Sequence, residues 1–239
     1  MPLIIVADKG EEPEPQIVDP KIVIQKAREG GNPNAALAIA YTDPIINIDQ
    51  TGLHYQLRNE PKGQEFSFDT GTLRIKLKQQ MFISNTLSNC AKQKWIVHEK
   101  GHVRDYQAVM SKMEEEIKND PTIWSILIKP KWIQRKKFDE TEKKIFNSIV
   151  NIFKHLTAQA SAAHDTRAEY MQVHSDILRN CPEPYIYEVI KGDTLSRIAD
   201  FMYGLGSAWQ SIYRENQAVI GDNPHMIQEG QRLVIPRTP

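Results

Sequence analysis

The sequence His98-Glu99-Lys100-Gly101-His102 lies within a long run of helical periodicity. Apolar residues recur at three- and four-residue spacing from about residue 87 to residue 117, and Asp120-Pro121 ends the run. They include Ile96, Val103, Tyr106, Met110, Met113 and Ile117. Residues four apart share one helix face, so His98 and His102 can reach a single metal ion with Glu99 beside it. The alternative is a helix that carries two histidines and a glutamate on a solvated face.

The motif resembles the active-site helix of the zincin metallopeptidases, and Gly101 resembles their frequent His-Glu-Leu-Gly-His form. Lys100 departs from the family pattern, which usually has an uncharged residue there. The resemblance implies that His98 and His102 bind Zn²⁺. It also implies that Glu99 is the general base of amide hydrolysis, taking a proton from the attacking water and delivering it to the leaving amine.

A catalytic zinc site needs three protein ligands and an open position. The zincins with an extra ligand soon after the motif are excluded, because Asp105 and Ala108 stand where a glycine and a histidine are required. Residues 163–170 concentrate His, Asp and Glu where we expect another helix to begin. By resemblance to the gluzincin branch, we expect Glu169 to be the third ligand, with Asp165 orienting a ligand histidine.

The match to the gluzincin pattern is incomplete, because Val173 stands where an aspartate is expected. His164, Asp165 and His174 therefore remain alternative ligands, and an ordinary charged helix face remains the alternative for the whole segment. A donor must also stabilise the developing oxyanion. The candidates are Tyr170, Arg167 and His164.

The C-terminal residues predict a small βααβ unit. A strand at Tyr187–Ile190 leads to a turn in which Gly192 allows a tight reversal, and Asp193 or Thr194 caps the next helix. The first helix carries Leu195, Ile198 and Ala199; the second carries Trp209, Ile212 and Tyr213 and ends near Asn216; Arg232–Ile235 form the last strand.

This region resembles a LysM domain along its whole length. The resemblance implies binding of peptidoglycan or another N-acetylglucosamine glycan in a groove between two loops. The glycan-binding residues would be Gly192, Asp193, Thr194, Leu195, Pro224, Met226 and Ile227. The alternative is turn and cap chemistry that any such module needs. Trp209 and the long loop at 218–224 resemble LysM modules of phage tail and baseplate proteins as much as those of secreted wall hydrolases.

We expect an α+β fold with four parts. These are a flexible arm at 1–20, a zincin-like domain at 21–180, a linker at 181–185 and the LysM module at 186–237. The zincin-like domain would have N-terminal strands, the long metal-binding helix and a helical C-terminal part. Its strands are expected at 45–48 and 54–58 and in a hairpin that turns at 69–71.

A second long helix is expected to bury Ile145, Phe146, Ile149, Phe153 and Leu156, and to break at 158–163. Cys90 and Cys181 flank the two proposed ligand segments, so either one disulfide or two buried thiols would fit.

The 239-residue chain has 30 basic and 30 acidic residues, which gives no nucleic-acid or membrane footprint. The basic run at 129–137 is expected to be a solvated loop, and no transmembrane run is visible. The N-terminus does not resemble a signal peptide. We therefore expect cytoplasmic synthesis, with exit in a phage or injection particle or by lysis.

These features together predict a zinc metallopeptidase that a LysM module directs to a peptide or protein substrate at the bacterial cell wall. The alternative is a structural component of a phage tail or contractile injection system. In that case the LysM module is a packing adaptor and the zincin-like domain is inactive.

Overall fold

The computed structural model describes residues 3–32 and 38–239, and the chain divides into two compact units. The first unit contains residues 1–12, 44–79 and 103–162, and the second contains residues 13–43, 80–102 and 163–239. This division does not follow the expected boundary at 181–185. Four long elements run through both units, namely β3 (Ala40–Asp49), β5 (Gly63–Ser84), α2 (Asn89–Asn119) and α4 (Phe138–His164).

In the first unit, β5 is the strand on which the others pair. β1 (Leu3–Asp8) runs parallel to it, while β4 (Leu53–Glu60) and β6 (Ile133–Gln134) run antiparallel. Leu3 and Ile5 of β1 are buried. The expectation of a flexible arm is therefore wrong for β1, because its alternate apolar side chains have a core to enter.

The expected hairpin turn at 69–71 is also wrong. β5 continues through these residues, and the chain turns at residues 61–62 instead. Gly71 pairs with Leu53, and a Cβ atom on Gly71 would overlap the backbone of Gly52 and Leu53. This glycine permits close strand approach, a role that a sequence pattern does not separate from a turn.

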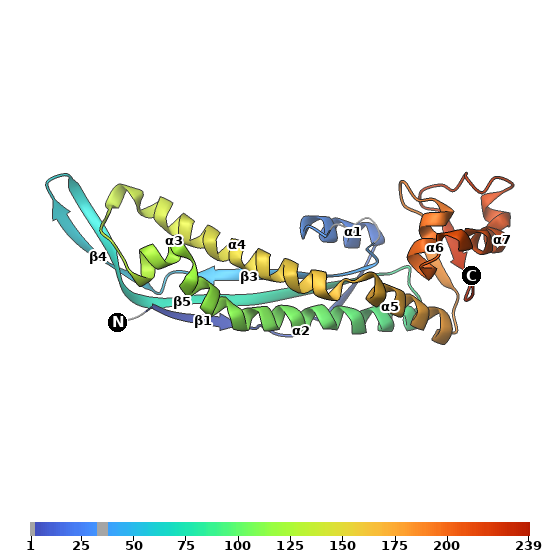
Figure 1. The fold of residues 1–239 in the computed structure, drawn as a ribbon, viewed down its shortest axis with the longest axis horizontal. Coiled ribbons are helices and arrows are strands. Elements are labelled where there is room, and N and C mark those ends of the chain that lie inside the picture. Colours follow the sequence, from blue (N-terminus) through green and yellow to red (C-terminus); the bar gives the residue numbers. More distant parts are fainter. Residues whose placement is uncertain (1–2, 33–37) are drawn as a thin grey trace. The chain divides into compact units, whose positions relative to one another are not determined.

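Two long helices complete the core of the first unit (Figure 1). The C-terminal half of α2 and most of α4 lie alongside each other and pack with β5 and β1. The expected residues of both helices are buried except Ile96, which is half-buried, and Phe146, which is 43% exposed. The shared buried set includes Val109, Met110, Met113, Ile117, Ile145, Ile149, Phe153 and Leu156.

The second unit begins with β2 (Pro15–Val18), which pairs parallel with the end of β5, followed by α1 (Pro20–Glu29). Helix α4 shows no break at 158–163 and continues to His164. After Asp165 the chain starts α5 (Arg167–Asn180), whose first turn is capped by Thr166, since its side chain accepts a 3.2 Å hydrogen bond from the Glu169 N–H. The cap sets the helix break at 165–166.

Cys90 and Cys181 form a disulfide, so the bridged alternative is the one observed. The bridge joins the first turn of α2 to the residue that ends α5, with a sequence separation of 91. The helix that carries the motif is thus covalently tied to the segment that leads into the C-terminal module.

The C-terminal module has the expected βααβ order. β7 (Tyr185–Glu188) pairs antiparallel with β8 (Arg232–Ile235), and α6 (Leu195–Tyr203) and α7 (Trp209–Ile220) lie between them in sequence. Asn216 does not end the second helix. It is buried, donates to the carbonyls of Ile212 and Val234 at 2.7 Å, and accepts from Val234 N–H at 2.7 Å, so it joins α7 to β8.

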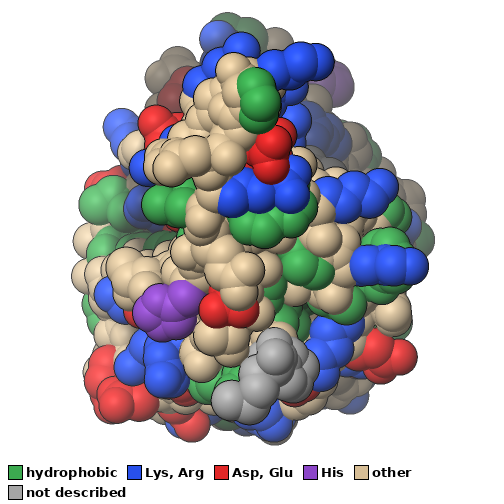
Figure 2. All heavy atoms as spheres, turned by 90° about the vertical axis from the view of Figure 1, so that its left-hand side faces the viewer, with side chains coloured by type: hydrophobic (Ala, Val, Ile, Leu, Met, Phe, Trp, Pro, Cys, Tyr) green, Lys and Arg blue, Asp and Glu red, His purple; other side chains and the backbone are tan. Residues whose placement is uncertain are grey.

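The surface carries mixed charge. On the face drawn in Figure 2, basic side chains alternate with hydrophobic and acidic ones. Arg58 shows the local pattern, because its guanidinium stacks 4.3 Å from the Trp132 ring and pairs with Glu65 at 2.6 Å. Among the described residues, no helix is long and apolar enough to cross a bilayer.

Candidate metal centre

One buried turn of α2 presents His98, Glu99 and His102. Their exposed fractions are 7%, 3% and 4%. The alternative of a solvated helix face is therefore wrong, since buried polar side chains need partners to offset their lost hydration.

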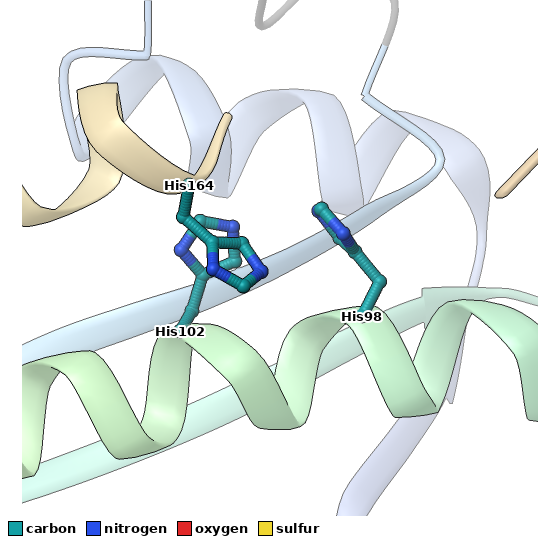
Figure 3. Close-up of side chains that lie close together, drawn as sticks. All are labelled: His98, His102 and His164. Atoms are coloured by element: carbon teal, nitrogen blue, oxygen red, sulfur yellow. The ribbon is translucent and has the colours of Figure 1, made fainter. Parts of the chain in front are cut away.

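A second element brings another histidine to this turn (Figure 3). His164, the last residue of α4, points toward His102, and His98 lies one turn away on α2. Ligand nitrogens of His98, His102 and His164 all lie within 4.8 Å of one another. We call these three residues the histidine group.

Gly101 makes this approach possible. A Cβ atom at Gly101 would overlap the imidazole of His164. The glycine of the motif is thus explained by contact with a helix more than 60 residues later, and not by backbone conformation.

Asp165 follows the histidine group directly and shares its centre. Its Oδ1 lies 2.8 Å from His102 Nε2 and 3.6 Å from His98 Nε2, and accepts a 3.0 Å hydrogen bond from the Tyr170 hydroxyl. Burial alone would raise the pKa of Asp165, but the interactions with His102, His98 and Tyr170 hold it well below its usual range. Asp165 is therefore a carboxylate at the point where the two imidazoles converge.

Glu99, on the same turn of α2, points away from solvent. Its Oε2 accepts a 2.7 Å hydrogen bond from the hydroxyl of Thr42 on β3. Burial raises the pKa of Glu99, while His102, His98 and Thr42 oppose this shift. A carboxyl with a raised pKa suits proton transfer near neutral pH.

The donor set fits a zinc ion. Zinc ligands lie about 2.0–2.1 Å from the ion, which places tetrahedral ligand atoms about 3.3 Å apart. The separations of 2.8 and 3.6 Å from Asp165 Oδ1 to the two Nε2 atoms bracket that value. Nε2 of His98 is also buried without a hydrogen-bond partner among the described residues, so a cation there would satisfy an otherwise unused lone pair.

Three sequence-based expectations need correction. Glu169 is exposed on the first turn of α5 and is not a member of the histidine group, because the helix break at 165–166 gives the inward position to Asp165. Arg167 also turns away from the group, pairing with Asp200 at 2.6 Å. His174 lies among Trp95, Phe201 and Tyr185, at ring distances of 4.7 to 5.9 Å, and outside the histidine group.

Two further residues of the site were not predicted, because no sequence pattern relates them to the motif. Thr42 meets Glu99 from a strand 57 residues earlier. Trp95, one turn before His98, is buried and packs its ring edge-on to His98 at 5.5 Å.

The LysM loops show mostly structural contacts. The Asp193 carboxylate accepts from the Tyr187 hydroxyl at 2.9 Å and from the Ile190 N–H at 3.0 Å, and Thr194 caps α6. Leu195 is buried in the module core. In the other loop, Met226 is 59% exposed and Pro224 and Ile227 are half-buried. Gly192, Thr194 and Met226 are exposed and available to a ligand, although Thr194 also caps α6, while Asp193 and Leu195 fulfil turn and core roles.

Comparisons with known proteins support the assignment of the C-terminal module. A two-stranded sheet with two helices between its strands defines a small βααβ domain. Residues 187–236 match the LysM domain family, which confirms the resemblance and supports binding of peptidoglycan or a related N-acetylglucosamine glycan. Searches of curated proteins and of solved structures returned no match. The zincin-like assignment of the preceding residues therefore stays a prediction.

Proposed function

We propose that this chain is a zinc-dependent peptidase or amide hydrolase whose LysM domain directs it to peptidoglycan. The observation that carries the proposal is the convergence of His98, His102 and Asp165 on one point beside the buried Glu99. Two imidazoles, a carboxylate and a neighbouring glutamate are the residue types that metal-assisted amide hydrolysis requires.

Each residue of the site has a separate role in the proposed reaction. His98, His102 and Asp165 would hold the ion, and Tyr170 orients the Asp165 carboxylate through its hydrogen bond. Bound zinc would supply Lewis-acid polarisation of the scissile carbonyl. Glu99 accepts the proton of the attacking water and returns it to the leaving amine, while Thr42 fixes the carboxylate through Oε2.

His164 decides between two functions. With three other ligands in place, His164 can donate a hydrogen bond to the developing oxyanion. As a fourth ligand it would close the coordination sphere, which is the arrangement of structural zinc sites. The proximity of all three ligand nitrogens in the histidine group supports such a stabilising metal. The second candidate function, a metal-stabilised structural component of a phage tail or injection system, would need no more than this.

Metal analysis and hydrolysis assays of matched variants test the proposal. Wild-type protein should contain about one zinc per chain, and His98→Ala/His102→Ala should contain almost none. Glu99→Gln should keep the metal and the fold while release of new amino groups from peptidoglycan sacculi falls by orders of magnitude. Zinc without hydrolysis in the wild type would favour the structural candidate, and zinc in the double histidine variant would remove the site altogether.

A further inference from the structure

A cavity of about 460 Å³ adjoins the candidate metal centre. Asp165, Tyr170 and Trp95 line it on the side of the centre. The LysM helix α6 contributes Arg197, Asp200 and Phe201 to the same cavity. The glycan-binding domain and the metal centre therefore share one pocket.

Specific contacts hold α6 at this pocket. The Arg167 guanidinium of α5 bonds to Asp200 Oδ1 at 2.6 Å and to the Gly204 carbonyl at 3.3 Å. Phe201 packs against the buried His174 with ring centroids 4.7 Å apart. These contacts make α6 a wall of the pocket.

Arg197 connects the pocket with the LysM loop. Its Nη1 donates a 2.8 Å hydrogen bond to the carbonyl of Gly192, in the loop that the LysM resemblance assigns to glycan binding. Among the described residues Arg197 forms no ion pair within 4 Å, although it attracts the Asp193 carboxylate at longer range, whereas Arg167 is paired with Asp200. With Arg167 and Asp200 paired and Asp165 engaged by a Zn²⁺ ion, the charges that line the pocket would sum to a net positive value, which favours an anionic ligand.

We propose that α6 is one wall of the substrate pocket, and that Arg197 binds a carboxylate of a peptide attached to the glycan held by the same LysM domain. This inference rests on the proposed function and specifies its substrate class as a glycan-linked acidic peptide, in preference to a free protein. A glycan at the Gly192 loop would place its attached peptide along Arg197 and into the pocket beside Asp165. Arg197 then selects the substrate and takes no part in proton transfer.

Binding assays can test this inference separately from catalysis. The full chain carrying Glu99→Gln is titrated with three probes by calorimetry. The probes are a peptidoglycan disaccharide–tetrapeptide, the same fragment with its peptide carboxylates amidated, and chitotetraose. We expect the acidic fragment to bind at least about 10-fold more tightly than the amidated one, since hydrogen bonds to charged groups contribute at that level.

Variants of Arg197 identify the residue responsible. Arg197→Ala should weaken binding of the acidic fragment by about 10- to 100-fold, and should weaken binding of the amidated fragment and of chitotetraose much less, because loss of the bond to Gly192 acts on all three probes alike. Arg197→Gln keeps a donor for the Gly192 carbonyl but removes the charge, so it should lose the preference for the acidic fragment even if Arg197→Ala folds poorly. Arg214→Ala, on the neighbouring helix α7 and outside the cavity lining, is the matched control and should bind all probes normally.

Equal binding of the acidic and amidated fragments, or unchanged binding by both Arg197 variants, would overturn the inference. Failure of the proposed function has a different signature. In that case the zinc-loaded wild type does not cleave the fragment, although its binding still depends on Arg197.

Discussion

The imidazole of His164 occupies the space that a Cβ atom on Gly101 would need. Only glycine at this position lets the end of α4 reach the motif turn of α2. The geometry of the candidate metal centre thus depends on Gly101, which offers no ligand atom, and substitution of this glycine tests that geometry directly.

Gly101→Ala should displace His164, and with it the neighbouring ligand Asp165, and so weaken zinc binding, even though alanine favours the helix by about 1 kcal/mol. Competition with a chromogenic chelator measures the affinity, and thermal unfolding monitors the fold. Ser111→Ala, at an exposed position of the same helix, is the control. Zinc affinity equal to wild type in Gly101→Ala would show that His164 is not needed at the centre.

Asp165→Ala should lose far more zinc affinity than Glu169→Ala. Asp165 lies at the convergence of His98 and His102, whereas Glu169 is exposed. Loss of an outer partner typically costs 10- to 100-fold in metal affinity, so a true ligand should exceed that range. Chelator titration of the two variants side by side ranks them, and a larger loss in Glu169→Ala would restore the gluzincin-like assignment.

Thr42→Val should impair hydrolysis without removing the metal. The change preserves shape but deletes the hydroxyl that donates to Glu99 Oε2, leaving a buried carboxyl oxygen without that donor. The free energy of unfolding should fall by about 1–3 kcal/mol. Thr42→Ser retains the hydroxyl and should behave like the wild type in urea unfolding and in turnover. Normal turnover of Thr42→Val would mean that Thr42 does not position Glu99.

Removing the disulfide should destabilise the protein without changing the histidine group. Cys90→Ala/Cys181→Ala releases a loop closed over 91 residues, and the free energy of unfolding should fall by about 2–4 kcal/mol. Urea unfolding of the variant, and of the wild type with and without reductant, measures the difference. Identical curves for oxidised and reduced wild type would contradict the prediction.

His174 should make the metal-free protein sensitive to acid. Burial lowers the pKa of His174 to about 3, so the folded state keeps the ring neutral while the unfolded chain takes up a proton near pH 6.5. The unfolded state binds more protons, and stability therefore falls as pH drops from about 6.5 toward 3, by at most about 1.4 kcal/mol per pH unit.

Urea unfolding at pH 7.5 and 5.0, in chelator, measures this loss. His174→Phe should lose less stability between the two pH values than the wild type. The exposed His155→Phe is the control and should behave like the wild type. An unchanged pH dependence in His174→Phe would mean that another group controls the acid response.

Local sequence patterns correctly predicted the parts of the fold that depend on interactions between residues close together in the chain. The spacing of apolar residues predicted α2 and the burial of Met110 and Met113, and turn and cap residues predicted α6 and β8 of the LysM domain. These features depend on neighbours within a few residues. Periodicity and capping report such neighbours directly.

The features that the sequence did not predict depend on partners that are distant in the chain. Gly71 was expected in a turn. Its place within β5 depends on pairing with Leu53 of the opposite strand, a contact that the local sequence does not reveal. Glu169 was preferred to Asp165 as the third ligand, but the position of the helix break between α4 and α5 places Asp165, and not Glu169, beside His98 and His102. Thr42 reached Glu99 through strand β3, which no local pattern relates to the motif.

The segment between α5 and β7 is fastened from two sides. Cys181 is bridged to α2, and Nη2 of Arg237 donates to the carbonyls of Cys181 and Pro182 at 2.7 and 2.9 Å. A flexible linker would let a bound enzyme search all bonds within its reach. In the proposed enzyme, a fastened segment would hold the glycan-binding loops at a set distance from the hydrolytic site. Cleavage by the proposed enzyme should then be confined to peptides attached close to the sugar that the LysM domain holds.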